Sequence, residues 1–171
     1  MKPRFAVPAL LGLLLFVWLA VATSGPAAPA MDLAIREAVH DHASPPLTGA
    51  MRFITGLGSG WFLWPCGGVI VLALVRVARR REAAFFVIAV VGANALNELM
   101  KLLFHRARPQ AYFDYPVPSN YSFPSGHSFV SFCFYLALAE MAMEAHWPLR
   151  RKLVMWSAAG ILVLAIGFSA V

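Results

Sequence analysis

Long apolar runs separated by short polar segments constrain the fold of this chain most. A helix needs about 20 mainly apolar residues to cross a bilayer, and five segments approach that length: residues 5–23, 61–75, 83–104, 128–143 and 153–171. Only 13% of the residues are charged, whereas charged residues make up about a quarter of an ordinary soluble domain. The sequence therefore predicts an all-α, multi-pass transmembrane helix bundle with five spans, in a single membrane domain over residues 1–171.

The basic residues indicate how these spans are oriented. The net charge is +6, and the basic residues cluster before the first run, after the second and before the last: Lys2 and Arg4; Arg76, Arg79, Arg80 and Arg81; Arg150, Arg151 and Lys152. Because loops rich in Lys and Arg stay in the cytoplasm, residues 24–60 and 101–127 are expected outside the cell. This bias explains the arginine cluster better than nucleic-acid binding does, so no nucleic-acid partner is expected.

The first run allows two interpretations. Its basic start, apolar stretch and small residues at 27–30 resemble a secretory signal with a cleavage site. The run is longer than the ~7–15 residues of a signal core, which favours a retained membrane anchor. After it, apolar residues within 31–39 predict a short helix on the membrane surface, ended by the Ser-Pro-Pro sequence at 44–46.

Two further groups carry residue types that bind metals. His40, Asp41 and His42 are adjacent, but no obvious further ligands accompany them, so we interpret them as solvated loop residues. Cys66 and Cys133 lie inside apolar runs, and we interpret them as small buried hydrophobic residues. Neither group predicts a metal site.

A pair of cations marks the start of the third polar loop. Lys101 and Arg108 are seven residues apart, a spacing that returns a helix to nearly the same face. Pro109 disfavours helix at Arg108, so the helix is expected to end there. A guanidinium binds two phosphate oxygens at once, and an ammonium acts as a point charge. The pair therefore suits an anionic headgroup at a membrane surface.

Three more polar residues share the predicted helical face of Lys101, namely Asn94, Asn97 and Glu98. Polar residues on an apolar transmembrane helix face protein or water rather than lipid. Glu98 is one turn from Lys101 and is expected to pair with it. Glu98 would then position Lys101 without touching a substrate.

The sequence Pro124-Ser125-Gly126-His127 opens the fourth run. Serine is a preferred helix N-cap, and the first amides of a helix carry partial positive charge. A glycine at this point lets an oxyanion approach the backbone closely, and an imidazole on the first turn suits a proton donor. The same four residues can also form a helix cap that has no function. The interpretation as a phosphate site therefore depends on the upstream Lys101 and Arg108.

Together these two segments resemble the type 2 phosphatidic acid phosphatase (PAP2) superfamily, which includes polyprenyl diphosphate phosphatases, lipid phosphate phosphatases and vanadium haloperoxidases. The first family motif, Lys, six residues, Arg-Pro, is matched by Lys101 with Arg108-Pro109, and the second, Pro-Ser-Gly-His, by residues 124–127. The resemblance covers the third to fifth runs and reaches the first two only in general layout. It implies a six-span bundle in the cell's inner membrane with an extracytoplasmic active site.

The resemblance also implies an activity. A PAP2 protein of this kind would hydrolyse a lipid phosphate, of the polyprenyl diphosphate or phosphatidic acid type, with no metal or other cofactor. Lys101, Arg108, Ser125 and Gly126 would bind the phosphoryl oxygens, and His127 would protonate the leaving oxygen. The lipid substrate and the bilayer are the expected partners.

The third family motif, Ser-Arg, five residues, His, three residues, Asp, is matched only at its start. Ser169 fits it, Ala170 stands where the family has a phosphate-binding arginine, and the nucleophilic histidine with its aspartate would follow Val171. We therefore expect a chain that is incomplete at its C-terminus and turns over poorly or not at all. Two alternatives stay open. One is a catalytically inactive PAP2-like protein that binds phosphate or lipid. The other is a small transporter or channel component, which polar residues concentrated at one end of the runs disfavour.

Overall fold

The computed structural model describes residues 28–106, 121–143 and 147–169, together with 18 and 21, and over these ranges the backbone forms helices and no strands. The predicted first span, residues 5–23, lies outside the described residues apart from Trp18 and Val21. Arg108 and Ala170 also lie outside them.

The chain divides into two compact units, and α2 (Ala28–His40) belongs to the first, which comprises residues 1–43 and 109–115. This helix covers the stretch predicted to form a short surface helix. His42 Nδ1 lies 2.8 Å from the carbonyl oxygen of Ala38, a contact typical of side chains that satisfy the last carbonyls of a helix. Within the described ranges no three His, Cys, Asp or Glu side chains group closely enough to hold a metal ion.

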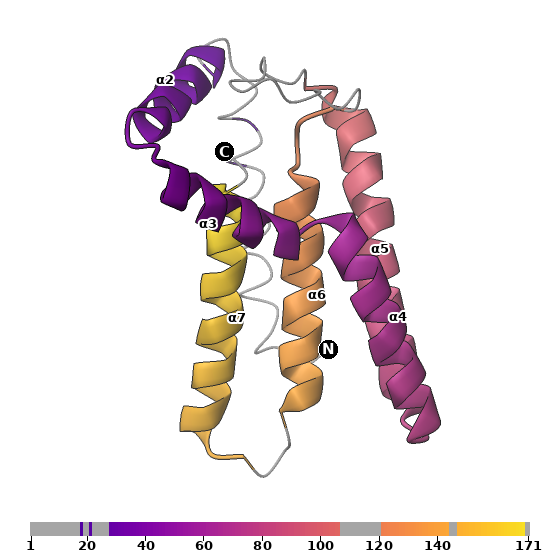
Figure 1. The fold of residues 1–171 in the computed structure, drawn as a ribbon. Coiled ribbons are helices and arrows are strands. Elements are labelled where there is room, and N and C mark those ends of the chain that lie inside the picture. Colours follow the sequence, from indigo (N-terminus) through magenta and orange to yellow (C-terminus); the bar gives the residue numbers. More distant parts are fainter. Residues whose placement is uncertain (1–17, 19–20, 22–27, 107–120, 144–146, 170–171) are drawn as a thin grey trace. The chain divides into compact units, whose positions relative to one another are not determined.

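The second unit, residues 44–108 and 116–171, carries the remaining described helices: α3 (Pro45–Leu57), α4 (Gly60–Arg76), α5 (Arg80–Phe104), α6 (Gly126–Ala142) and α7 (Leu149–Ser169). The last four of these occupy the last four predicted runs (Figure 1). By length and composition α5 and α7 are suited to cross a membrane, and the bent pair α3 and α4 is a third candidate. The fold is therefore all-helical with two or three candidate spans among the described residues, and the count of five stays a prediction.

The apolar pattern gave no sign of α3. Pro45 and Pro46, expected only to end a helix, are the first residues of this one. Proline suits the first helical positions because the N–H that it lacks would have no intrahelical partner there. α3 lies across α7 near the C-terminal end of that helix (Figure 1), and a bend of 44° separates it from α4.

The junction between α3 and α4 requires a glycine. A methyl group on Gly58 would overlap Cγ2 of Ile166 in α7 and would lie 3.5 Å from the carbonyl oxygen of His127 in α6. Ile166 is fully buried, so its side chain has little room to move aside. The junction can therefore approach both helices closely only because Gly58 has no side chain.

We expect Gly58→Ala to lower the Tm of the purified protein in detergent by several degrees. Overpacking of a dense core costs about 1–3 kcal/mol, and 1 kcal/mol shifts Tm by about 2–4 °C in a chain of this size. Gly49→Ala in α3 is the matched control, because nothing lies within 4 Å of its added methyl group. Equal Tm values for the two variants would contradict this packing.

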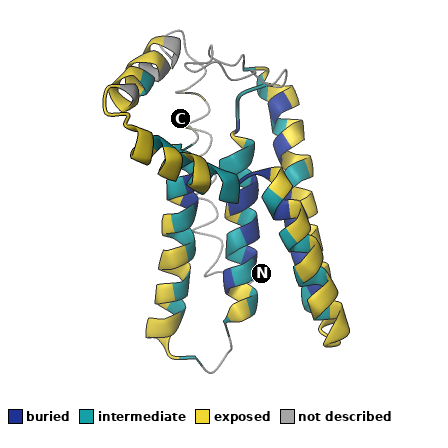
Figure 2. Ribbon diagram, in the orientation of Figure 1, coloured by how far each residue is buried: buried dark blue, intermediate teal, exposed yellow. Residues whose placement is uncertain are grey.

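The apolar core of the second unit lies between α4, α5 and α6. Phe86 of α5 and Phe134 of α6 are each 1% exposed and meet edge to face, with ring centroids 5.2 Å apart. The buried members of this cluster are Leu63, Phe86, Val90, Val130, Phe134 and Ala137. Figure 2 shows exposed residues along α4 and α5, and many of them are large and apolar, as a lipid-facing surface requires. The core fixes α5 against α6, and this packing positions the site described next.

Candidate active site

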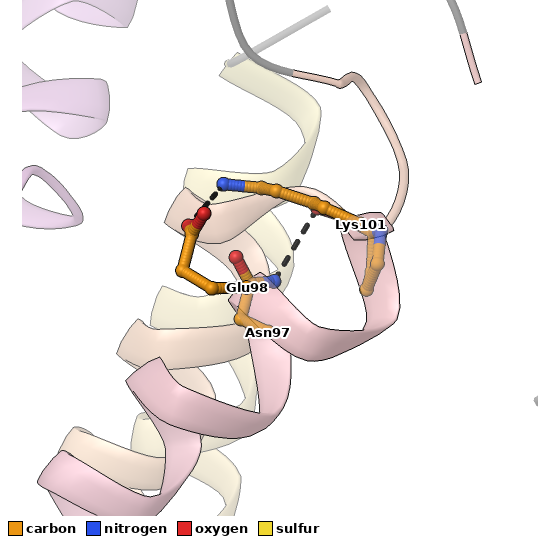
Figure 3. Close-up of polar contacts among 4 residues, drawn as sticks. Asn97, Glu98 and Lys101 are labelled. Carbon is orange, nitrogen blue, oxygen red and sulfur yellow. Dashed lines mark hydrogen bonds and ion pairs between the residues drawn. The ribbon is translucent and has the colours of Figure 1, made fainter. Parts of the chain in front are cut away.

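The end of α5 and the start of α6 meet at Lys101 and Gly126. A methyl group on Gly126 would lie 3.8 Å from Lys101 Nζ and 3.4 Å from Asn97 Oδ1. The Nδ2 group of Asn97 donates a hydrogen bond of 3.3 Å to the carbonyl oxygen of Pro124 (Figure 3). The structure therefore brings the two predicted phosphate-binding segments together, with the backbone of Gly126 beside the Lys101 ammonium.

Lys101 is an unusually buried cation, with 6% of its surface exposed. Its Nζ pairs with Oε1 of Glu98 at 2.6 Å, and the Glu98 side chain is 63% exposed (Figure 3). The pairing expected from the sequence is thus present. A buried ammonium is unfavourable unless it is well compensated, and it carries three N–H donors. Glu98 is its ion-pair partner among the described residues, so donors remain for a bound anion.

The start of α6 adds further positive charge next to this ammonium. Ser125 is the N-cap, and its Oγ accepts a hydrogen bond of 3.4 Å from the Ser128 backbone N–H. The first amides of a helix have no intrahelical partner and carry partial positive charge. His127 lies on this first turn, and its carbonyl oxygen accepts a hydrogen bond from the fully buried Ser131 hydroxyl. The backbone that carries the imidazole is therefore well anchored.

The end of α7 reaches the same region. A methyl group on Gly167 would lie 3.2 Å from Oγ of Ser128, in the first turn of α6. Two residues later, both the carbonyl oxygen and Oγ of Ser169 lie 2.8 Å from Oγ1 of Thr55 in α3. The predicted start of the third motif is thus held between α6 and α3.

The residues just before α6 are tied to the end of α5. The backbone N–H and the hydroxyl of Ser122 both donate to the carbonyl oxygen of Arg106, at 2.9 and 3.1 Å. The rings of Phe104 and Phe123 meet edge to face with centroids 5.1 Å apart. These contacts join the described residues on either side of the segment 107–120, which contains Arg108 and lies outside the described residues.

Five of the predicted site residues therefore lie at one end of the second unit: Lys101, Ser125, Gly126, His127 and Ser169. Two features of this site were not predicted from the sequence. Thr55 belongs to a helix that the apolar pattern did not indicate. The contact of Asn97 with Pro124 joins residues 27 apart, and its only signal was an amide on the Lys101 face of an apolar helix.

Known proteins share this arrangement. A family model described as the PAP2 superfamily matches residues 82–171, more than half of the chain. The chain belongs to the PAP2 superfamily. The resemblance inferred from the motifs is thereby confirmed, and the chain is by family a phosphatase.

Relatives in this family extend the likeness beyond the matched segment. Phosphatidylglycerophosphatase B of Bacillus subtilis (strain 168) is 32% identical over 161 residues, which cover 92% of this chain and 78% of the relative. The crystal structure of a transmembrane PAP2 type phosphatidylglycerolphosphate phosphatase from Bacillus subtilis superposes with a TM-score of 0.80 at 28% identity, and the match covers 92% of this chain and 78% of that one. PAP2 membership and the apolar helices α5 and α7 together support a membrane location.

Proposed function

We propose that this PAP2 protein hydrolyses the phosphate of a membrane lipid at the site between α5, α6 and α7. The observation that carries the proposal is the approach of the buried Lys101 ammonium to Gly126 at the start of α6. A cation beside the N-terminus of a helix suits a tetrahedral anion. The relative named for phosphatidylglycerophosphate supports a lipid carrier for that anion.

The proposed reaction has two steps. Lys101, Arg108 and the backbone at residues 125–126 stabilise charge on the phosphoryl oxygens. A histidine nitrogen attacks phosphorus, the P–O bond to the lipid breaks, and His127 gives its proton to the leaving oxygen. Water then attacks the phosphohistidine and loses a proton to His127, the P–N bond breaks, and inorganic phosphate leaves. We propose that this nucleophile is the histidine of the third family motif, whose pattern begins at Ser169.

Ala170 favours a second candidate function. It occupies the position of a phosphate-binding arginine in the third family motif, and a protein without that cation has less charge to stabilise the transition state. A PAP2 protein that binds lipid phosphate without hydrolysing it is therefore the alternative.

We also propose that the site faces away from the cytoplasm, in a single inner-membrane domain of residues 1–171 with five spans. The arginines at 79–81 lie at the start of α5, and the basic residues at 150–152 lie at the start of α7. Lys101 and Ser169 lie at the opposite ends of the same two helices. Since cytoplasmic loops carry the excess of Lys and Arg, the phosphate site belongs to the extracytoplasmic side.

We expect the full-length protein to release inorganic phosphate from phosphatidylglycerophosphate in detergent micelles faster than from phosphatidic acid or undecaprenyl diphosphate. The reason is the 32% identity to a relative named for the first of these lipids. Soluble glycerol 3-phosphate, which has the phosphate without acyl chains, is the control and is expected to react slowly. Binding of these lipids without phosphate release would support the inactive alternative. A protein that neither binds nor hydrolyses them would contradict both functions.

A further inference from the structure

The side chain of Asn97 lies against the segment that opens α6, one turn of α5 before Lys101 (Figure 3). It is 2% exposed. Its Nδ2 group donates to the carbonyl oxygen of Pro124, and its Oδ1 lies 3.4 Å from the position of a methyl group on Gly126. The amide nitrogen is therefore bonded to the second motif, and the amide oxygen lies beside it.

Burial favours the hydrogen-bonded position of the Asn97 side chain. A buried polar group is unfavourable without a hydrogen-bond partner, and Asn97 sits in an apolar helix beside the buried Pro124. The hydrogen bond satisfies the amide nitrogen of one helix and the carbonyl oxygen of the next segment together. Movement of the segment away from α5 would leave both groups unpaired.

The position of this contact distinguishes it from the other links between α5 and the segment before α6. The Arg106–Ser122 and Phe104–Phe123 contacts join the end of α5 to the residues before the second motif. The Asn97 contact lies within the motif, one residue before the Ser125 N-cap and two before Gly126. The Asn97 hydrogen bond therefore links α5 to the residues directly before the first amides of α6.

We infer that Asn97 is a positioning residue of the phosphate site. By holding the Pro124 carbonyl it fixes the start of α6 next to Lys101, so that amides and ammonium act on one phosphoryl group. The inference rests on the proposed function, because it concerns the same site. Misplacement of stabilising groups by about 1 Å can lower a rate by about 10²-fold. The effect falls mainly on the transition state, where charge on the phosphoryl oxygens must be matched.

The test compares Asn97→Leu with Asn94→Leu. Leucine has the same number of side-chain heavy atoms and the same branch at Cγ as asparagine, and it has no donor. Asn94 lies on the same helix, and its Nδ2 donates to Val90 within α5 at 3.0 Å, so it does not hold the start of α6. We expect Asn97→Leu to lower kcat on phosphatidylglycerophosphate by about 10²-fold with little change in KM. Vanadate, an analogue of the transition state, is expected to bind more weakly by a similar factor. Asn94→Leu is expected to keep kcat and vanadate binding.

Two results would overturn the positioning role: equal kcat and equal vanadate affinity in the two variants, or a KM increase without a kcat loss. Asn97→Ser retains a hydroxyl donor and is expected to keep more activity than Asn97→Leu. If the leucine variant does not fold, the serine variant replaces it in the comparison with wild type. If Asn97→Ser is no more active than the leucine variant at equal Tm, the hydrogen bond is not the cause. A wild-type protein that binds vanadate but releases no phosphate from any lipid would contradict the proposed hydrolysis. The vanadate affinities of the wild type and the Asn97 variants, measured by calorimetry, would then still test the positioning role.

Discussion

Replacing His127 by alanine is expected to lower kcat/KM for phosphatidylglycerophosphate by about 10²–10⁴-fold, the usual contribution of a positioned general acid. The lipid alkoxide is a poor leaving group and needs a proton, which in the proposed mechanism comes from His127 in the first turn of α6. With p-nitrophenyl phosphate the loss is expected to be much smaller, because nitrophenolate leaves without protonation. Measuring kcat/KM for both substrates isolates the step in which the P–O bond breaks.

His105→Asn is the matched control for this substitution. His105 ends α5 in the same region, where its ring packs edge to face on Tyr121 with centroids 4.7 Å apart. Its φ of 47° is one that asparagine tolerates, so the variant is expected to keep near wild-type activity. An equal loss on both substrates in His127→Ala would contradict proton donation and indicate a role in binding phosphate. Full activity would remove His127 from the mechanism.

Replacing Lys101 by methionine is expected to lower kcat/KM by about 10²–10³-fold, as the loss of one preorganised charge-stabilising group typically does. Stability is expected to respond differently. Lys101 is buried, and an apolar side chain of similar size in place of a buried ion is often neutral or stabilising. Glu98, left without its partner, is largely exposed to solvent. We therefore expect a Tm at or above that of the wild type together with the loss of activity.

Arg81→Met at the start of α5 is the control, since Arg81 is exposed and lies at the other end of the same helix. It removes an equal charge, and we expect it to leave kcat/KM unchanged. Wild-type activity in Lys101→Met would contradict the proposed phosphate site. An activity loss that merely follows a fall in Tm would assign Lys101 to the fold rather than to the reaction.

Much of the helical framework was predictable because its signal is local. The runs at 83–104 and 153–171 are long and apolar, and the transfer of such segments into lipid favours helix whatever surrounds them. Short spacings also indicated that Lys101 and residues 124–127 belong to one site, and the structure brings them together. Their chemical roles stay predictions. α3 was not predictable in this way, because its first residues are two prolines and its apolar content is modest.

The sequence by itself determined that this protein is a helical membrane phosphatase of the PAP2 type, and it predicted that Lys101, Gly126 and His127 take part in phosphate chemistry. Only the tertiary structure decided that Gly126 lies next to Lys101, that Asn97 holds Pro124, and that Thr55 meets Ser169 from 114 residues away. Periodicity and hydrophobicity act between near neighbours in the chain. Contacts between helices depend instead on the fit of side chains distant in sequence, such as Phe86 against Phe134 and Gly58 against Ile166.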